Sequence, residues 1–94
     1  MWYAVQLYRE FFSEILHLNR MTKPELASLR KKLGKNLQKI RLAKDMSLLD
    51  VSYNCDIDDS RISKIEHGKV NITIGTLFEL ARGLEVDPAK LLDF

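Results

Sequence analysis

The sequence predicts an all-α protein, with five helices in residues 21–94 and an additional amphipathic helix in residues 1–20. Three observations favour this fold class. Gly and Pro are scarce, at four and two residues in a chain of 94. Apolar side chains recur at intervals of three and four residues through most of the chain, which is the period of a helix with one buried face. Ser, Thr or Asp precedes five of these runs, where a helix start needs a side-chain oxygen to accept its unpaired N–H groups.

Residues 1–20 are predicted to form a strongly amphipathic helix, with apolar side chains from Ala4 to Leu18 spaced four, three, four and three apart. So large an apolar stripe needs a cover. The domain's own core, a different protein or the same helix in a second subunit would each supply one, and we favour the second subunit. Another explanation is that Met21 is the natural start and the preceding residues are upstream sequence. The contact residues expected of this arm are Tyr8, Phe11, Phe12 and Ile15.

A long helix is predicted from Thr22 to Lys44. Thr22 and Glu25 have the spacing of a capping box, in which each side chain accepts from the backbone N–H of the other residue. The apolar positions then keep helical spacing for about twenty residues, some 30 Å at 1.5 Å per residue. Gly34 lies in the middle of this helix, where it costs roughly 1 kcal/mol relative to Ala. We therefore expect another helix to approach closely at Gly34.

The centre of the chain is predicted to form two short helices joined by a tight turn. Ser47 and Asp50 make a second capping box, so the first helix begins near residue 48 and ends near residue 55. Asp58 caps the second helix, which covers residues 59–66, and Gly68 ends it. The inward positions of the second helix are apolar, and its outward positions are Ser, Arg and Lys. Such a face suits a helix that enters a polar groove.

Two further helices are predicted at the C-terminal end. Thr73 caps the first, and Asp87 caps the last, with Pro88 in a position where its missing N–H does no harm. The side chains expected on the buried side of the first are Leu77, Phe78, Leu80, Ala81 and Leu84. Those expected on the apolar face of the last are Leu91, Leu92 and Phe94. Packing in the core and contact with a second subunit both explain this last stripe.

The net charge of +2 conceals an uneven distribution of charge. Residues 20–44 hold nine basic residues against the single acid Glu25, whereas residues 45–94 hold five basic residues against ten acids. Such asymmetry indicates a polyanionic partner for one face of the molecule. A solvated helix face would also explain a lysine-rich helix, but the neighbouring pair of short helices favours the polyanion.

The sequence offers no signal for catalysis, a cofactor, a metal or a small-molecule ligand. His17 and His67 are isolated from catalytic partners, and no Gly-rich phosphate loop or nucleophile elbow occurs. The single cysteine, Cys55, excludes an internal disulfide, and no Cys/His cluster has the spacing of a zinc site. No apolar run approaches the ~20 residues that span a bilayer, so we expect a cytoplasmic protein without membrane association.

A specific motif runs through residues 33–68. It consists of Leu33-Gly34, Ile40-Arg41, Ser47, Val51-Ser52 and then Ile57, Ser60, Ile62-Ser63, Ile65-Glu66 and Gly68. In this motif, and in the apolar spacing that follows it, residues 33–94 resemble the phage-repressor (Xre/Cro) helix-turn-helix family of small transcriptional regulators. The resemblance covers about sixty of the 94 residues.

The resemblance implies a regulator that binds double-stranded DNA as a homodimer, at a pseudo-palindromic operator, in a prokaryotic or phage nucleoid. The second short helix would enter the major groove. Its base-reading residues would be Asp59, Ser60, Arg61 and Lys64. Phosphate contacts would come from Ser47, Leu48, Ser63, Lys69 and Asn71. The matching positions further imply a structural ion pair between Arg41 and Glu66 and an interface that includes Leu91, Leu92 and Phe94.

Two positions depart from the family pattern. Leu48 occupies a position where the family often has Gln, and Asp59 adds a negative charge beside the cap residue Asp58. Within the family, the chain is similar both to small phage repressors and to restriction-modification controllers. The alternative from another class is a protein-protein interaction module, an antitoxin-like adaptor that keeps the fold and docks through residues 1–20. Steep salt dependence of binding would identify the regulator.

Overall fold

The computed structural model of the chain describes residues 4, 9, 10, 12 and 21–94. These residues contain helices and no strand, so the all-α prediction is confirmed for them. From residue 21 onward the helices are α2 (Lys23–Ala43), α3 (Leu48–Tyr53), α4 (Asp59–Glu66), α5 (Ile74–Leu84) and α6 (Pro88–Leu91). Most of the helix predicted in residues 1–20 lies outside the described residues, and so do its expected contact residues Tyr8, Phe11 and Ile15.

The helices α2 to α6 begin at the caps that the sequence predicts. Thr22 and Glu25 form a capping box, with donor-acceptor distances of 3.1 and 3.2 Å. Asp58, Thr73 and Asp87 each accept a backbone N–H from the first turn of the helix that follows. These contacts are local, because a short side chain satisfies an orphan N–H two or three residues further on. The start of each helix is therefore fixed by its own sequence.

The chain between α3 and α4 turns earlier than predicted. α3 ends at Tyr53 and not near Cys55, because Asn54 already caps it. α4 then begins at Asp59, as predicted. It ends before Gly68, whose φ of +70° is the left-handed conformation that glycine adopts without strain.

The middle of α2 lies directly against the C-terminal end of α4. A Cβ added at Gly34 would lie 2.6 Å from the carbonyl oxygen of Ile65 and closer still to that of Glu66. Both contacts are with backbone, which cannot rotate away as a side chain can. The predicted close approach at Gly34 is confirmed, and the approaching helix is α4, the one expected to enter a polar groove.

Every helix from α2 to α6 contributes to one core. The largest fully buried side chains are Leu37, Ile62, Ile65, Leu80, Leu84, Leu91 and Val51. Leu91 is 0% exposed, so it packs within the protomer and is not available for the subunit interface expected of it. Only Leu92 and Phe94 of that expected stripe remain exposed.

One residue predicted for the buried side of α5 is exposed. Phe78 is 55% exposed, whereas Leu80, Ala81 and Leu84 are at most 2% exposed. The physical reason is the helical period: at 100° per residue, Phe78 falls to one side of the arc that these three positions occupy. Phe78 therefore points away from the core that the rest of its helix covers.

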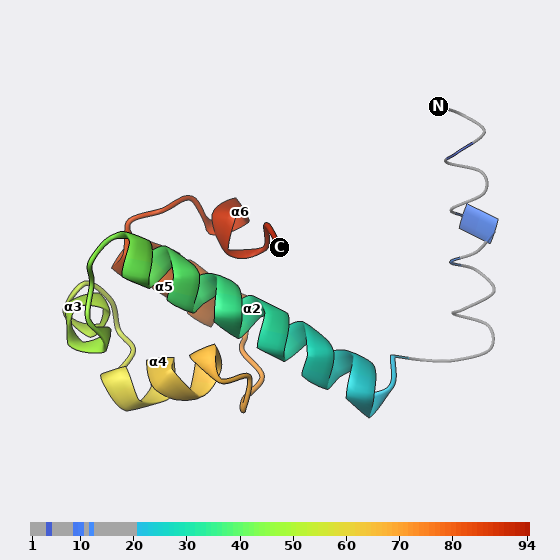
Figure 1. The fold of residues 1–94 in the computed structure, drawn as a ribbon, viewed down its shortest axis with the longest axis horizontal. Helices are drawn as coiled ribbons and strands as arrows, with labels where there is room; N and C mark the ends of the chain where they lie inside the picture. The colour runs from blue at the N-terminus through green and yellow to red at the C-terminus, as the bar shows by residue number, and fades with distance from the viewer. Residues whose placement is uncertain (1–3, 5–8, 11, 13–20) are drawn as a thin grey trace.

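The arrangement of the helices sets α4 apart from α6. In Figure 1, α2 crosses the middle of the described fold, with α4 below it and α6 above it. α4 packs on α2 and α3, whereas α3 also packs on α5, and α6 on α5 and α2. The pair of short helices thus contacts both of the longest helices of residues 21–94, α2 through α4 and α5 through α3. In the part of the chain that the structure describes, no helix is both long and apolar enough to cross a bilayer.

Candidate nucleic-acid interface

The outward face of α4 is polar along its whole length. Ser60, Arg61 and Lys64 are exposed on it, and Ser63 is half-buried. Asp59, in the first turn of the helix, is also exposed. The inward side carries isoleucines that are 2% exposed, so the helix is held by one side only. All four residues expected to read bases are therefore accessible from solvent.

An open hollow lies between α4 and the loop that follows it. Its volume is ≈ 460 Å³, and its lining residues are Asp58, Ser60, Arg61, Lys64, Val70 and Asn71. The hollow brings three of the expected base-reading residues next to Asn71, one of the expected phosphate-binding residues. The fourth, Asp59, does not line it. Two cationic side chains, the Asp58 carboxylate and three uncharged residues line it, so it offers both donors and acceptors to a base edge.

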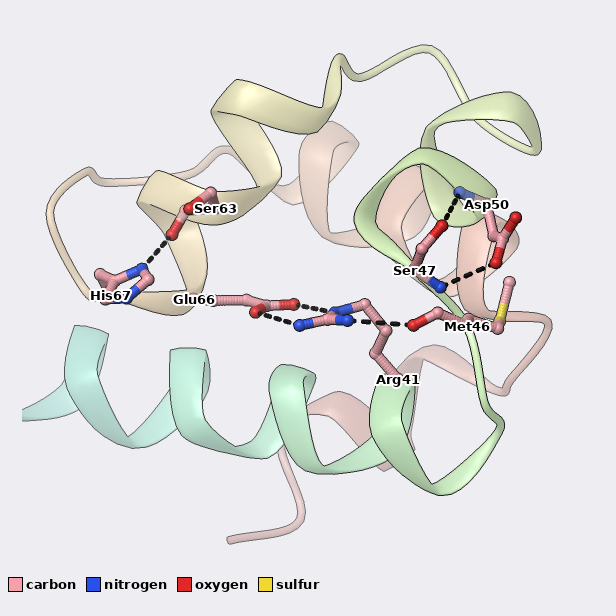
Figure 2. Close-up of polar contacts among 7 residues, drawn as sticks. All are labelled: Arg41, Met46, Ser47, Asp50, Ser63, Glu66 and His67. Carbon is pink, nitrogen blue, oxygen red and sulfur yellow. Dashed lines mark hydrogen bonds and ion pairs between the residues drawn. The ribbon is translucent and has the colours of Figure 1, made fainter.

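The ion pair expected between Arg41 and Glu66 is present and buried. Arg41 Nε donates to Glu66 Oε2 at 2.7 Å, and a second guanidinium nitrogen donates to Glu66 Oε1 at 3.0 Å. The third nitrogen donates to the carbonyl oxygen of Met46, also at 3.0 Å. Figure 2 shows the guanidinium between these two partners. The hydrogen bonds that Arg41 donates to Glu66 raise the pKa of Arg41, against the opposing effect of burial.

This ion pair fixes the orientation of α4. Arg41 lies in α2, Glu66 lies in the last turn of α4, and Met46 directly precedes the α3 cap residue Ser47. One guanidinium therefore joins three segments, and each of its nitrogens already has a protein partner. A bidentate pair has a defined geometry, so it sets an angle as well as a distance. Arg41 is a support of the candidate interface and not part of its surface.

The start of α3 is a second capping box. The Ser47 N–H donates to Asp50 Oδ2 at 2.8 Å, and the Asp50 N–H donates to Ser47 Oγ at 3.0 Å (Figure 2). The bond from the Ser47 backbone lowers the pKa of the Asp50 carboxyl. Because the cap engages both the amide and the hydroxyl of Ser47, its first role is structural. Leu48, the next residue, is half-buried.

Arg30 is a residue of this region that the sequence analysis did not single out. Its Nε donates to the Gly68 carbonyl oxygen at 3.3 Å, and its guanidinium also donates to Asn71 Oδ1 at 3.4 Å. It thus holds the loop between α4 and α5, in which Lys69 is exposed. The available signal was its position four residues before Gly34, on the same face of α2.

The structure also exposes an apolar pair that the sequence analysis did not predict. Ile74 is 75% exposed and Phe78 is 55% exposed, and the two are one turn apart on α5. Leu92 and Phe94, expected at an interface, are 56% and 54% exposed. Phe12, expected in the N-terminal arm, is 46% exposed. Within the described ranges, no cluster of three side chains suits a metal ion.

Comparison with known proteins places the chain in a family. A family model described as Helix-turn-helix matches residues 37–91, which include α3, α4 and α5 entirely. Among curated proteins, the control protein C.BamHI of Bacillus amyloliquefaciens is 34% identical over 68 residues. That match covers 71% of this chain and 84% of the relative.

Two solved structures are similar over the same region. The restriction-modification controller C.AhdI of Aeromonas hydrophila is 27% identical, with a TM-score of 0.63, over 66% of this chain and 94% of its own. The controller C.Esp1396I, solved as a tetramer with its natural 35-base-pair operator, is 35% identical, with a TM-score of 0.64. That match covers 69% of this chain and 86% of the controller. By the family model and these relatives, the chain belongs to the helix-turn-helix family of small transcriptional regulators.

Proposed function

We propose that this protein is a dimeric, sequence-specific DNA-binding regulator of the restriction-modification controller kind. The observation that carries the proposal is the outward face of α4, where Ser60, Arg61 and Lys64 are exposed around a polar hollow. A helix with such a face, held rigidly from behind, fits the major groove of a duplex. The similarity to C.BamHI and C.Esp1396I supports the controller role, which would place the protein in the cytoplasm, on DNA.

Base reading falls to the exposed residues of α4. Arg61 and Lys64 carry donors that match O6 and N7 of guanine, and each good contact is worth about 1–3 kcal/mol of discrimination. Ser60 accepts or donates and so tolerates several bases. Asp59 accepts only, which restricts it to donors such as cytosine N4. The expected operator half-site therefore contains guanine opposite the Arg61 and Lys64 end of the hollow.

Phosphate contacts fix the register of α4 in the groove. Lys69 and Asn71 follow α4 in the loop that Arg30 holds, and both are exposed. On the other side of α4, the amide of Leu48 begins α3, where the helix dipole favours an anion. Ser63 and Ser47 contribute hydroxyl groups near these ends. Such contacts position the protein without reading sequence.

A two-fold dimer would present two copies of α4 to one face of the duplex. Recognition helices separated by about 34 Å, one turn of DNA, require a pseudo-palindromic operator. We expect the subunit contact at exposed apolar side chains, because free energy is gained when their apolar surface is removed from water. In the described residues these include Ile74, Phe78, Leu92 and Phe94. Residues 1–20, through Tyr8, Phe11, Phe12 and Ile15, would extend that contact.

The test is selection of bound sequences from random duplex DNA with the parent protein, Arg61→Ala and Arg82→Ala. Arg82 is the matched control because it is an exposed arginine on α5, outside the hollow, so both variants lose one charge. We expect the parent and Arg82→Ala to enrich the same pseudo-palindrome and Arg61→Ala to lose it. No enrichment by the parent, or equal enrichment by Arg61→Ala, would refute the proposal.

Salt dependence separates this function from that of an adaptor. Binding through six to ten phosphates weakens by about 10³–10⁵ between 50 and 200 mM salt, because released counterions drive it. An adaptor that docks through an apolar helix would hardly respond to salt. Affinity of the selected duplex, measured by fluorescence anisotropy across this range, distinguishes the two.

A further inference from the structure

A row of lysines lies on the flank of α2 that is turned away from α4. Lys32, Lys35 and Lys39 are exposed and follow one another at spacings of three and four, so they share one side of the helix. The α2 residues that meet α4 are different ones, Gly34 and Arg41. The lysine row and the α4 surface therefore face in different directions.

The charge of this row is not neutralised within the described protein. Among the described residues the ion pairs are Arg41 with Glu66 and Arg82 with Glu79, so none of the three lysines takes part in one. Like charges four apart, such as Lys35 and Lys39, destabilise a helix. A partner of opposite charge would relieve that repulsion.

The row borders an open hollow of ≈ 380 Å³, lined by Lys32, Lys35, Asn36, Lys39, Asp93 and Phe94. Of the four apolar residues proposed for the subunit contact, Phe94 alone lines this hollow. Asn36 joins the α2 and α6 sides of the hollow, because the Asn36 amide donates to the carbonyl oxygens of both Lys90 and Leu91 at 2.9 Å. The lysines are therefore presented from a fixed helix beside a fixed α6. Asp93 lies at the hollow without forming an ion pair with any of them.

The spacing of the row suits a duplex. Lys32 and Lys39 are seven residues apart, which is about 10 Å along an α-helix. Double-stranded DNA carries one negative charge per roughly 1.7 Å of its axis, so a segment of that length offers several phosphates. Protein interfaces are instead poor in lysine and rich in aromatic residues and Arg. Charge and composition together favour DNA over an acidic protein.

We propose that Lys32, Lys35 and Lys39 form a second DNA-binding surface, which holds the phosphates of a duplex segment other than the one in contact with α4. This inference rests on the proposed function, because it adds a second duplex to a protein already bound to its operator. The contact is independent of sequence, since ammonium groups bind phosphates as point charges. A dimer would carry two such surfaces and would bring separate DNA segments together.

The experiment uses the full chain, saturated with an unlabelled duplex of the selected consensus, and a labelled duplex of unrelated sequence. We expect the parent to bind the labelled duplex at about 50 mM salt and to release it as salt rises. The triple variant Lys32→Gln, Lys35→Gln and Lys39→Gln should bind it at least about tenfold more weakly. Its affinity for the consensus duplex should stay within about twofold of the parent's, because these residues lie off the α4 surface.

The matched control is Lys23→Gln, Lys44→Gln and Arg82→Gln, which removes three charges from exposed positions elsewhere. It should bind both duplexes as the parent does. Thermal unfolding followed by circular dichroism verifies that each variant is folded before it is compared.

The outcomes separate this inference from the function beneath it. If the parent binds the consensus but not the labelled duplex, or the triple variant binds both like the parent, the second surface does not exist. Equal loss of both duplexes would assign the lysines to the operator contact and would also overturn the inference. Binding of polyglutamate but not of the labelled duplex would identify an acidic protein as the partner. If the parent fails to bind the consensus, the proposed function fails, and the labelled duplex alone then tests the surface by the same variants.

Discussion

The helices α4 and α5 are alike on their inner sides and opposite on their outer sides. Both begin at a side-chain cap and bury apolar residues in the same core. Outward, α4 exposes Ser60, Arg61 and Lys64, whereas α5 exposes Ile74 and Phe78. The fold requires only the inner rows, because these are the ones that leave water on folding. The outer rows are free to differ, so they carry the information about partners.

The two outer faces demand different partners. The polar face of α4 is well hydrated, so it is stable in water without a bound duplex. The apolar pair on α5 gains free energy when it is covered, at roughly 25 cal/mol per Å² of apolar surface removed from water. A second copy of the chain would cover it in the dimer proposed above. The predictions below change the support beneath α4, the α5 face, the α4 face and the cap of the neighbouring helix α3.

The largest effect is expected when the support beneath the α4 face is removed. Arg41→Ala should destabilise the protein by about 3–5 kcal/mol, because it leaves the Glu66 carboxylate buried without its partner. Glu66 is 7% exposed, so water cannot replace the guanidinium. Urea unfolding at neutral pH measures the change. Arg82→Ala, which breaks an exposed pair, should cost less than about 1 kcal/mol. A loss below that level in Arg41→Ala would contradict the structural role.

The next effect concerns the α5 face. Phe78→Glu should weaken self-association at least about tenfold, since a charge would be buried in the subunit contact. Sedimentation equilibrium measures the association. The stability of the monomer should change by less than about 0.5 kcal/mol, because the side chain lies outside the core. Tyr53→Glu is the matched control, as Tyr53 is an aromatic residue 78% exposed on α3. Equal loss of association in both variants would mean that α5 is not the interface.

A smaller effect sharpens the α4 face. Asp59→Asn should tighten binding to unrelated duplex DNA by about three- to tenfold, because it removes a like charge at the groove-entering end. The same change should cost about 0.3–1 kcal/mol of stability, since an acid in the first turn favours the helix dipole. Anisotropy titration and urea unfolding measure the two effects. Asp56→Asn, an exposed loop variant of equal charge, should leave DNA affinity within about twofold. Weaker binding by Asp59→Asn would instead mean that the Asp59 carboxylate makes a favourable contact with a base.

The smallest effect is a dependence of stability on pH at the α3 cap. The Ser47 amide holds the pKa of Asp50 below its ordinary 3.8 in the folded protein. The stabilisation is therefore present above the unfolded pKa and is lost as pH falls through the lower folded pKa. Asp50→Asn should make the stability curve flatter on its acidic side than the parent's. Unfolding midpoints between about pH 2 and 6 measure this slope. Unchanged slopes in the two proteins would mean that the cap contributes nothing at acid pH.

Local signals in the sequence were enough to predict the helix starts and the contact at Gly34. A cap acts within three residues, and a glycine in the middle of a helix has few explanations other than close approach. Phe78 was placed on the buried side of α5 because the predicted apolar stripe was too wide. The helical period puts Phe78 at the edge of that stripe, and whether an edge position is covered depends on the helices that pack on α5. α3 ends at Tyr53, two residues before the predicted end near residue 55, because Asn54, the first residue of the run expected to stop the helix, is already its C-cap.

In the candidate site, too, features set by local sequence were predictable, and those set by contacts between distant residues were not. The outward face of α4 was predictable because its polar residues occupy the positions that the helical period leaves outside. The resemblance to the phage-repressor family supplied Arg41 and Glu66 as a pair, which single residues 25 positions apart do not reveal. Arg30 and its loop contacts were missed, since they join positions 38 and 41 residues apart. Leu91 was assigned to an interface because an apolar stripe does not say which of its members faces inward.

The absence of a side chain at Gly34 has a consequence for how this protein recognises its target. Adding even one methyl group there would push the backbone of Ile65 and Glu66 outward and so tilt α4 relative to α2. In a two-fold dimer both copies of α4 would tilt, in opposite directions along the duplex, and the distance between the two half-sites would change. A buried residue outside the α4 surface would then set the half-site spacing that the protein accepts.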